Sequence, residues 1–158
     1  FICYFLCLVS SLAMYSTISF IGYNHRKKLV RDAIWWFLPK YVGRHVLDIE
    51  IHDKRMNREG TDAACMFSGY SRPREFFIEM NNSLDDNEYL KGLFHELIHL
   101  KQWVLRQRVT TKDNKDYWYG KQIDDNVAYM DLPWEKEAYS REDTVFNWYL
   151  KSQEYNRV

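Results

Sequence analysis

The sequence predicts an α+β fold in which a small antiparallel or mixed sheet packs against two long helices. Apolar residues recur at helical spacing over 86–106 and again from Pro133 to about residue 155. Three shorter stretches between residues 45 and 81 carry the apolar patterns of strands. The chain has 158 residues, of which 17% are aromatic, and this suits a single compact domain with a sizeable core.

The N-terminal segment, residues 1–23, is mostly apolar and uncharged, and the basic run His25-Arg26-Lys27-Lys28 follows it. Its length suits a membrane span, and the basic flank would place the rest of the chain in the cytoplasm. Several serines dilute it, however, and the alternative that we prefer is a gene start extended upstream of a true start at Met14. Residues 24–158 then form the expected domain, cytoplasmic and either free or membrane-anchored.

Within that domain the first expected helix is 29–41, whose inward stripe consists of Val30, Ala33, Ile34 and Phe37. The expected strands are 45–53, 63–70 and 75–81, joined by turns at 57–62 and 71–73. The second helix, 86–106, can begin at a capping box formed by Asp85 with Glu88 or by Ser83 with Asp86.

The charge and cysteine content exclude two classes of protein. Lys+Arg and Asp+Glu both number 22, so the formal net charge is zero and no strongly basic nucleic-acid surface is expected. The three cysteines, Cys3, Cys7 and Cys65, are too few and too unevenly spaced for a disulfide framework. Cys65 lies in an apolar stretch and is expected to be a buried, reduced thiol.

Two histidines four residues apart, His95 and His99, lie in the middle of the second helix. Positions i and i+4 share one helical face, so the two imidazoles can bind the same tetrahedral Zn²⁺. Glu96 is one step round the helix, where its carboxylate can act on a metal-activated water without binding the metal. This H-E-x-x-H pattern is typical of zinc hydrolases; the alternative is two solvated histidines on an amphipathic helix.

A catalytic zinc needs a third protein ligand. Neither a histidine nor a cysteine follows His99, so a downstream ligand must be a carboxylate. Pro133 suits the first turn of the last helix. The inward face of that helix is marked by Ala138, Val145, Phe146 and Tyr149. Glu135 lies at the centre of this face and is the expected third ligand, unless it is an ordinary first-turn acid favoured by the helix dipole.

Two other glutamates of the last helix have different expected positions. Glu137 points about 200° away from Glu135, towards solvent. Glu142 falls on the inward face two turns further on, so it is either an alternative ligand or a residue that supports the metal site.

These motifs resemble the gluzincin metallopeptidases, and in particular their small phage-type and bacterial members. The segment 95–102 is similar to their H-E-x-x-H-x-x-Q pattern, ending at Gln102, and 133–139 is similar to P-W-E-x-E-A-Y. At the position of Tyr139, larger relatives carry an aspartate that orients a histidine. The Tyr139 hydroxyl could still form a hydrogen bond there. The resemblance implies a zincin-like fold, and the lack of a downstream histidine argues against metzincin and SprT-like patterns.

Two further regions could contact a substrate. In zincins a strand at the sheet edge lies over the metal, and the segment 76–80 is the candidate here, with an ordinary core strand as the equal alternative. Residues 109–130 form an expected polar loop whose aromatic residues could line a cleft or pin the loop to the body. Its candidate lining residues are Tyr117, Trp118, Tyr119, Gly120 and Tyr129, and one of the tyrosines could stabilise an oxyanion.

The function expected from the sequence is therefore a zinc-dependent metallopeptidase acting on a peptide or protein substrate. Zn²⁺ would be bound by His95, His99 and Glu135, with Glu96 as the general base. Gln102, Tyr129, Tyr139 and Glu142 would support the site or contact the substrate. The alternative is a non-catalytic, zinc-stabilised binding domain that keeps the same fold.

Overall fold

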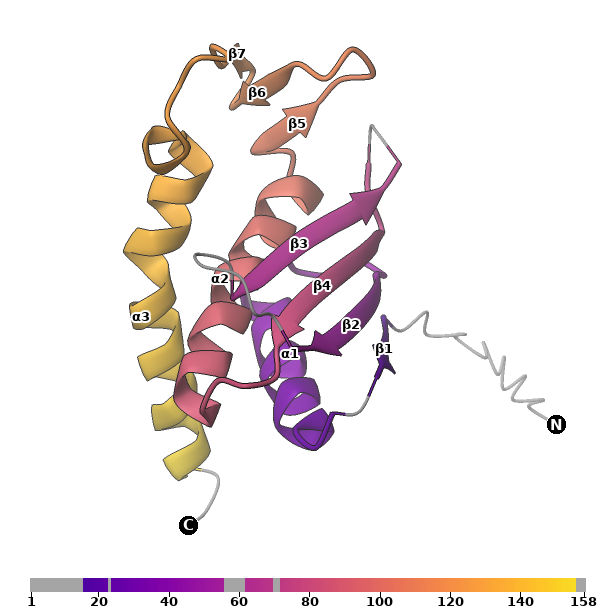
Figure 1. Ribbon diagram of the computed structural model, residues 1–158, viewed down its shortest axis with the longest axis vertical. Coiled ribbons are helices and arrows are strands. Elements are labelled where there is room, and N and C mark those ends of the chain that lie inside the picture. The colour runs from indigo at the N-terminus through magenta and orange to yellow at the C-terminus, as the bar shows by residue number, and fades with distance from the viewer. Residues whose placement is uncertain (1–15, 23, 56–61, 70–71, 156–158) are drawn as a thin grey trace, which may run out of the picture.

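The computed structural model describes residues 16–22, 24–55, 62–69 and 72–155, which form an α+β domain (Figure 1). Its helices are α1 (Lys27–Tyr41), α2 (Asp86–Val104) and α3 (Pro133–Tyr155), and a 3₁₀ turn, η1 (Tyr129–Asp131), precedes α3. The main sheet consists of β1 (Thr17–Ile21), β2 (Asp48–Lys54), β3 (Ala63–Ser68) and β4 (Glu75–Asn81). The expected combination of helices with a small mixed sheet is thus confirmed.

The strands of the main sheet follow the order β1-β2-β4-β3. β1 and β4 both run parallel to β2, whereas β3 runs antiparallel to β4, with Cys65 opposite Ile78. Figure 1 shows α1 and α2 behind this sheet and α3 beside α2, on the side away from the sheet. α2 and α3 run in opposite directions, so the middle of α2 faces the first turns of α3.

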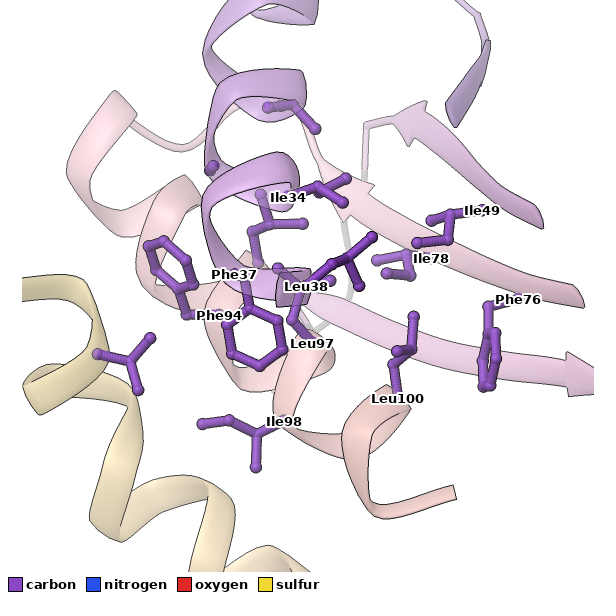
Figure 2. Close-up of a cluster of buried hydrophobic side chains, with 14 of the residues drawn as sticks. Ile34, Phe37, Leu38, Ile49, Phe76, Ile78, Phe94, Leu97, Ile98 and Leu100 are labelled. Carbon is purple, nitrogen blue, oxygen red and sulfur yellow. The ribbon is translucent and has the colours of Figure 1, made fainter. Parts of the chain in front are cut away.

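The core lies between the sheet and the helices (Figure 2). Alternate residues of β2 and β4 enter it, and Ile49, Ile51, Phe76 and Ile78 are all at most 1% exposed. Phe37 of α1 and Phe94 of α2 meet there with their ring centroids 6.2 Å apart. This packing holds α2 in a fixed position against the sheet.

The two long helices begin where the sequence indicates. The Asp85 carboxylate caps α2 by accepting hydrogen bonds from the backbone N–H groups of Asn87 and Glu88, at 2.8 and 2.9 Å. α2 ends at Val104, two residues earlier than expected, because Arg106 has a φ of 59° and leaves the helix. α3 spans Pro133–Tyr155, as the spacing of its apolar residues predicts.

Part of the apolar segment 1–23 belongs to the main sheet. Residues 17–21, within the apolar segment 1–23, form β1 and pair with β2, and half-buried Ile18 and Phe20 pack against the core. Residues 1–15, with the suggested start at Met14, and residue 23 lie outside the described residues. Among the described residues, the structure contains no helix with the length and apolar character needed to cross a membrane.

The region expected to be a polar loop, 109–130, is more regular than its composition suggests. β5 (Arg108–Thr110), β6 (Asp116–Trp118) and β7 (Lys121–Gln122) form a small antiparallel sheet. Tyr119 and Gly120, both with positive φ, make the tight turn between β6 and β7. In Figure 1 this small sheet lies beyond the C-terminal end of α2 and the N-terminal end of α3.

Candidate metal centre

Three buried side chains meet where α2 faces the start of α3. His95 and His99 come from consecutive turns of α2, and Glu135 comes from the first turn of α3. Their exposed fractions are only 8%, 7% and 3%, and one nitrogen or oxygen from each lies within 4.8 Å of the others. The residues that the sequence singles out are therefore close enough to bind one metal ion.

The spacing of the donor atoms can be compared with that of a tetrahedral site. Ligands about 2.0–2.2 Å from a tetrahedral metal lie about 3.3–3.6 Å from one another. His95 Nε2 and His99 Nε2 are 3.1 Å apart, and Glu135 Oε2 lies 3.4 and 3.3 Å from these two nitrogens. The three atoms thus match three corners of a tetrahedron with little movement.

The electrostatics of this group also favour a cation. Among the described residues, no donor reaches the buried Glu135 Oε2 in good hydrogen-bond geometry, and an orphaned buried oxygen is costly. Burial opposes charge on both His95 and Glu135, yet Glu135 and Glu142 raise the pKa of His95 to about 9. Contacts with both histidines likewise lower the pKa of Glu135 to about 2. The carboxylate of Glu135 therefore stays ionised and needs a cation beside it, either a protonated histidine or a metal ion.

The second nitrogen of each imidazole has its own partner. His95 Nδ1 lies 2.7 Å from Glu142 Oε2, and His99 Nδ1 lies 2.9 Å from Gln102 Oε1. Such contacts orient the ring and direct its Nε2 at the metal position. Glu142 and Gln102, both considered from the sequence, thus support the two histidines, and Glu142 is not one of the three converging groups.

Tyr139 contacts the site in a way that its sequence position does not indicate. Its ring packs edge-on against His95, with the centroids 4.6 Å apart, while 44% of the residue remains exposed. Glu142, three residues later, places its carboxylate on the His95 ring instead. In this chain one turn of α3 thus supplies both a ring contact and a carboxylate contact to the same histidine.

Glu96 lies beside the three converging groups without joining them. It is only 6% exposed, and its carboxylate accepts a hydrogen bond from the backbone N–H of Cys65 in β3. Burial raises the pKa of Glu96, and the two neighbouring histidines only partly offset this effect. A carboxylate with a raised pKa, held next to a metal position, is suited to accept and return a proton.

A cleft of about 770 Å³ opens onto the three converging groups and Glu96. Ala63, Ala64 and Cys65 of β3 line one wall of it. The expectation that 76–80 is the edge strand is wrong, because β4 lies between β2 and β3. Its alternative, a core strand, is confirmed: the N–H and C=O groups of β4 are used on both sides, which leaves β3 as the edge strand at the cleft.

The aromatic residues of 109–130 divide into two groups. Tyr129 lines the cleft, near enough to Glu135 that burial and this carboxylate raise the pKa of its hydroxyl. Trp118 instead packs against Tyr119 and Trp134, with ring centroids 4.9 and 6.4 Å away. The tyrosine at the cleft and the aromatic cluster that pins the segment are therefore different residues.

Arg108 lines the cleft as well, although nothing in the sequence pattern marked it. Its guanidinium lies between Trp103 and Trp134, 4.3 and 3.9 Å from the ring centroids, and Nη2 donates to Asp116 at 3.2 Å. Burial lowers the pKa of Arg108, and Asp116 opposes this shift. The cation joins the end of α2, the small sheet and the start of α3, which no local spacing rule could predict.

The expectation that Glu137 points towards solvent is wrong. Its side chain is only 15% exposed and contacts Lys101 at 3.0 Å, Gln102 at 3.0 Å and Arg141 at 3.1 Å. The helical phase does turn Glu137 away from Glu135, but the C-terminal half of α2 packs along that flank of α3. The phase within one helix therefore does not determine which side chains become buried.

Comparisons of the chain with protein-family models, with curated proteins and with solved structures found no match. The likeness to gluzincins thus remains a likeness of two short motifs. The structure itself contributes an α+β fold with a buried His95–His99–Glu135 group that is close enough to bind a metal ion.

Proposed function

We propose that the protein is a zinc-dependent metallopeptidase with a zincin-like fold. The observation that carries this proposal is the meeting of His95, His99 and Glu135 at tetrahedral spacing, with Glu96 beside them on the floor of an open cleft. A site that serves only the fold has no need of a cleft or of a second buried acid next to the metal.

Zinc is the metal that these donors suit best. Two imidazole nitrogens and one carboxylate oxygen, with one position left open, form the ligand set typical of catalytic zinc. When bound, zinc supplies Lewis-acid polarisation of the scissile carbonyl and acidifies water. His95, His99 and Glu135 would hold it, and Glu142 and Gln102 would keep the two rings in position.

Glu96 would move the proton. Its carboxylate takes a proton from the attacking water and delivers it to the nitrogen of the leaving amine. The raised pKa supports both steps, because a weakly acidic carboxyl group holds the proton until the amine needs it. The Cys65 N–H keeps the carboxylate facing the cleft while this happens.

Tyr129 and β3 would hold the substrate. The Tyr129 hydroxyl lines the cleft close to Glu135, where it can donate to the carbonyl oxygen that becomes negative during attack. Among the described residues, no strand pairs with the outer edge of β3, so an extended peptide can add there by backbone hydrogen bonds. An extended peptide chain is therefore the substrate class that we infer.

Metal analysis and a cleavage screen over mixed peptides test the proposal. The purified wild type should contain one zinc per chain and cleave at least one peptide, and Glu96→Gln should keep the zinc but lose cleavage. Glu154→Gln, the same substitution at an exposed site near the end of α3, is the matched control and should leave both unchanged. Zinc without cleavage in the wild type would favour the zinc-stabilised binding domain, and the absence of zinc would overturn both.

A further inference from the structure

Gln102 is a fully buried polar side chain with three partners. It is 0% exposed, and its Oε1 lies 2.9 Å from His99 Nδ1. Its Nε2 donates to the backbone carbonyl of Trp134 and to Glu137 Oε2, both at 3.0 Å. Each end of the amide is therefore satisfied, as burial requires.

The chemistry of these partners leaves the amide only one orientation. A backbone carbonyl and an ionised carboxylate can only accept hydrogen bonds, so the NH₂ group must face Trp134 and Glu137. The amide oxygen must then face His99. Because an amide oxygen only accepts, the Nδ1 of His99 must carry the proton that it donates.

Glu137 is kept ionised by its other two contacts. Lys101 Nζ donates to it at 3.0 Å and Arg141 Nε lies 3.1 Å away. A protonated Glu137 could donate to Gln102, and the amide could then turn its NH₂ group towards His99. Lys101 and Arg141 favour the ionised carboxylate, which can only accept from Gln102.

We propose that Glu137 and Gln102 are positioning residues that fix the tautomer of His99, with the proton on Nδ1 and the lone pair of Nε2 directed at the metal position. The purpose of this arrangement depends on the proposed metal site, but the arrangement itself exists without metal. A neutral His95 would obtain the same tautomer directly from the Glu142 carboxylate. The Gln102 amide gives His99 a proton on Nδ1 as well. It does so while keeping the Glu137 charge one side chain farther from the three acids near the metal position, Glu135, Glu96 and Glu142.

The tautomer can be measured by ¹⁵N NMR of the metal-free protein with labelled histidines, at about pH 8.5, where free imidazole side chains are neutral. The wild type should show His99 protonated on Nδ1. Gln102→Leu, which removes the acceptor with little change in volume, should move the proton to Nε2. Glu142→Gln is the matched control, because it alters the partner of His95 and should leave the His99 tautomer unchanged.

A double variant tests rescue. In Gln102→Glu/Glu137→Gln the acid and the amide exchange places, so a carboxylate accepts from His99 Nδ1 and the amide at position 137 can donate to that carboxylate. It should restore the Nδ1 proton of His99, although a carboxylate at position 102 no longer donates to the Trp134 carbonyl. Gln102→Leu, by contrast, should bind zinc about 10–100-fold more weakly. A wild-type His99 protonated on Nε2 overturns the proposal, even if Gln102→Leu fails to fold. So does a Gln102→Leu protein that keeps the proton on Nδ1. Neither result depends on whether the protein hydrolyses peptides.

Discussion

Replacing Glu137 by alanine should destabilise the protein, although helical phase alone marks it as a tolerant surface position. The substitution removes the charged acceptor of Gln102, a 3.0 Å contact with Lys101, which is 12% exposed, and a 3.1 Å contact with Arg141, which is 57% exposed. It also leaves Gln102 Nε2 and the Lys101 ammonium without these partners in a region that contains little water.

The size of the effect follows from how deeply each contact is buried. A hydrogen bond to a charged group contributes about 1.5–3 kcal/mol, whereas an exposed pair such as that with Arg141 contributes about 0–0.5 kcal/mol. Alanine regains a few tenths of a kcal/mol through its higher helix propensity. We therefore expect the free energy of unfolding to fall by about 2–3 kcal/mol.

Urea unfolding of the metal-free protein, monitored by tryptophan fluorescence, measures this change. The midpoint should fall at an unchanged slope, since the extent of burial in the native state is the same. Glu154→Ala, on the exposed side of the same helix, should change the stability by no more than about 0.5 kcal/mol. A Glu137→Ala protein as stable as the Glu154→Ala control would show that the Glu137 contacts do not contribute, and the burial argument would then be refuted.

Four further predictions concern the proposed metal site and the core. Glu135→Ala should lose zinc at micromolar metal, because it removes one of the three proposed ligands; retained stoichiometric zinc would exclude Glu135 as a ligand. Since the pKa of His95 is raised to about 9 without metal, zinc binding near pH 7 should release a proton, which calorimetry in two buffers of different ionisation enthalpy measures. Titrations at several pH values should show the zinc affinity rising about tenfold per pH unit up to about pH 9. The same shift should stabilise the metal-free protein fully below about pH 6.5 and be lost as the pH rises through about 9. Phe94→Ala, at a position that is 0% exposed, should cost about 3–5 kcal/mol in unfolding free energy, and a loss below 1 kcal/mol would contradict the packing of Figure 2.

The sequence by itself determined the features that depend on neighbours along the chain. The start of α2 at Asp85, the shared face of His95 and His99, and the extent of α3 all follow from helical periodicity and capping. Glu135 could be chosen over Glu137 as a ligand for the same reason, since the position of a side chain around a helix depends only on its place in that helix.

Only the tertiary structure decided the features that depend on residues far apart. β1 is a strand because it lies beside β2, 31 residues later, and β3 rather than β4 is at the cleft because of the order in which strands pair. Glu137 is buried because α2 passes along its side of α3, and Arg108 lies in the cleft because Trp103 and Trp134 meet around it. Helical hydrogen bonds span four residues and leave a period in the sequence. Strand order and contacts between helices arise only when distant segments pack, and they leave no such period.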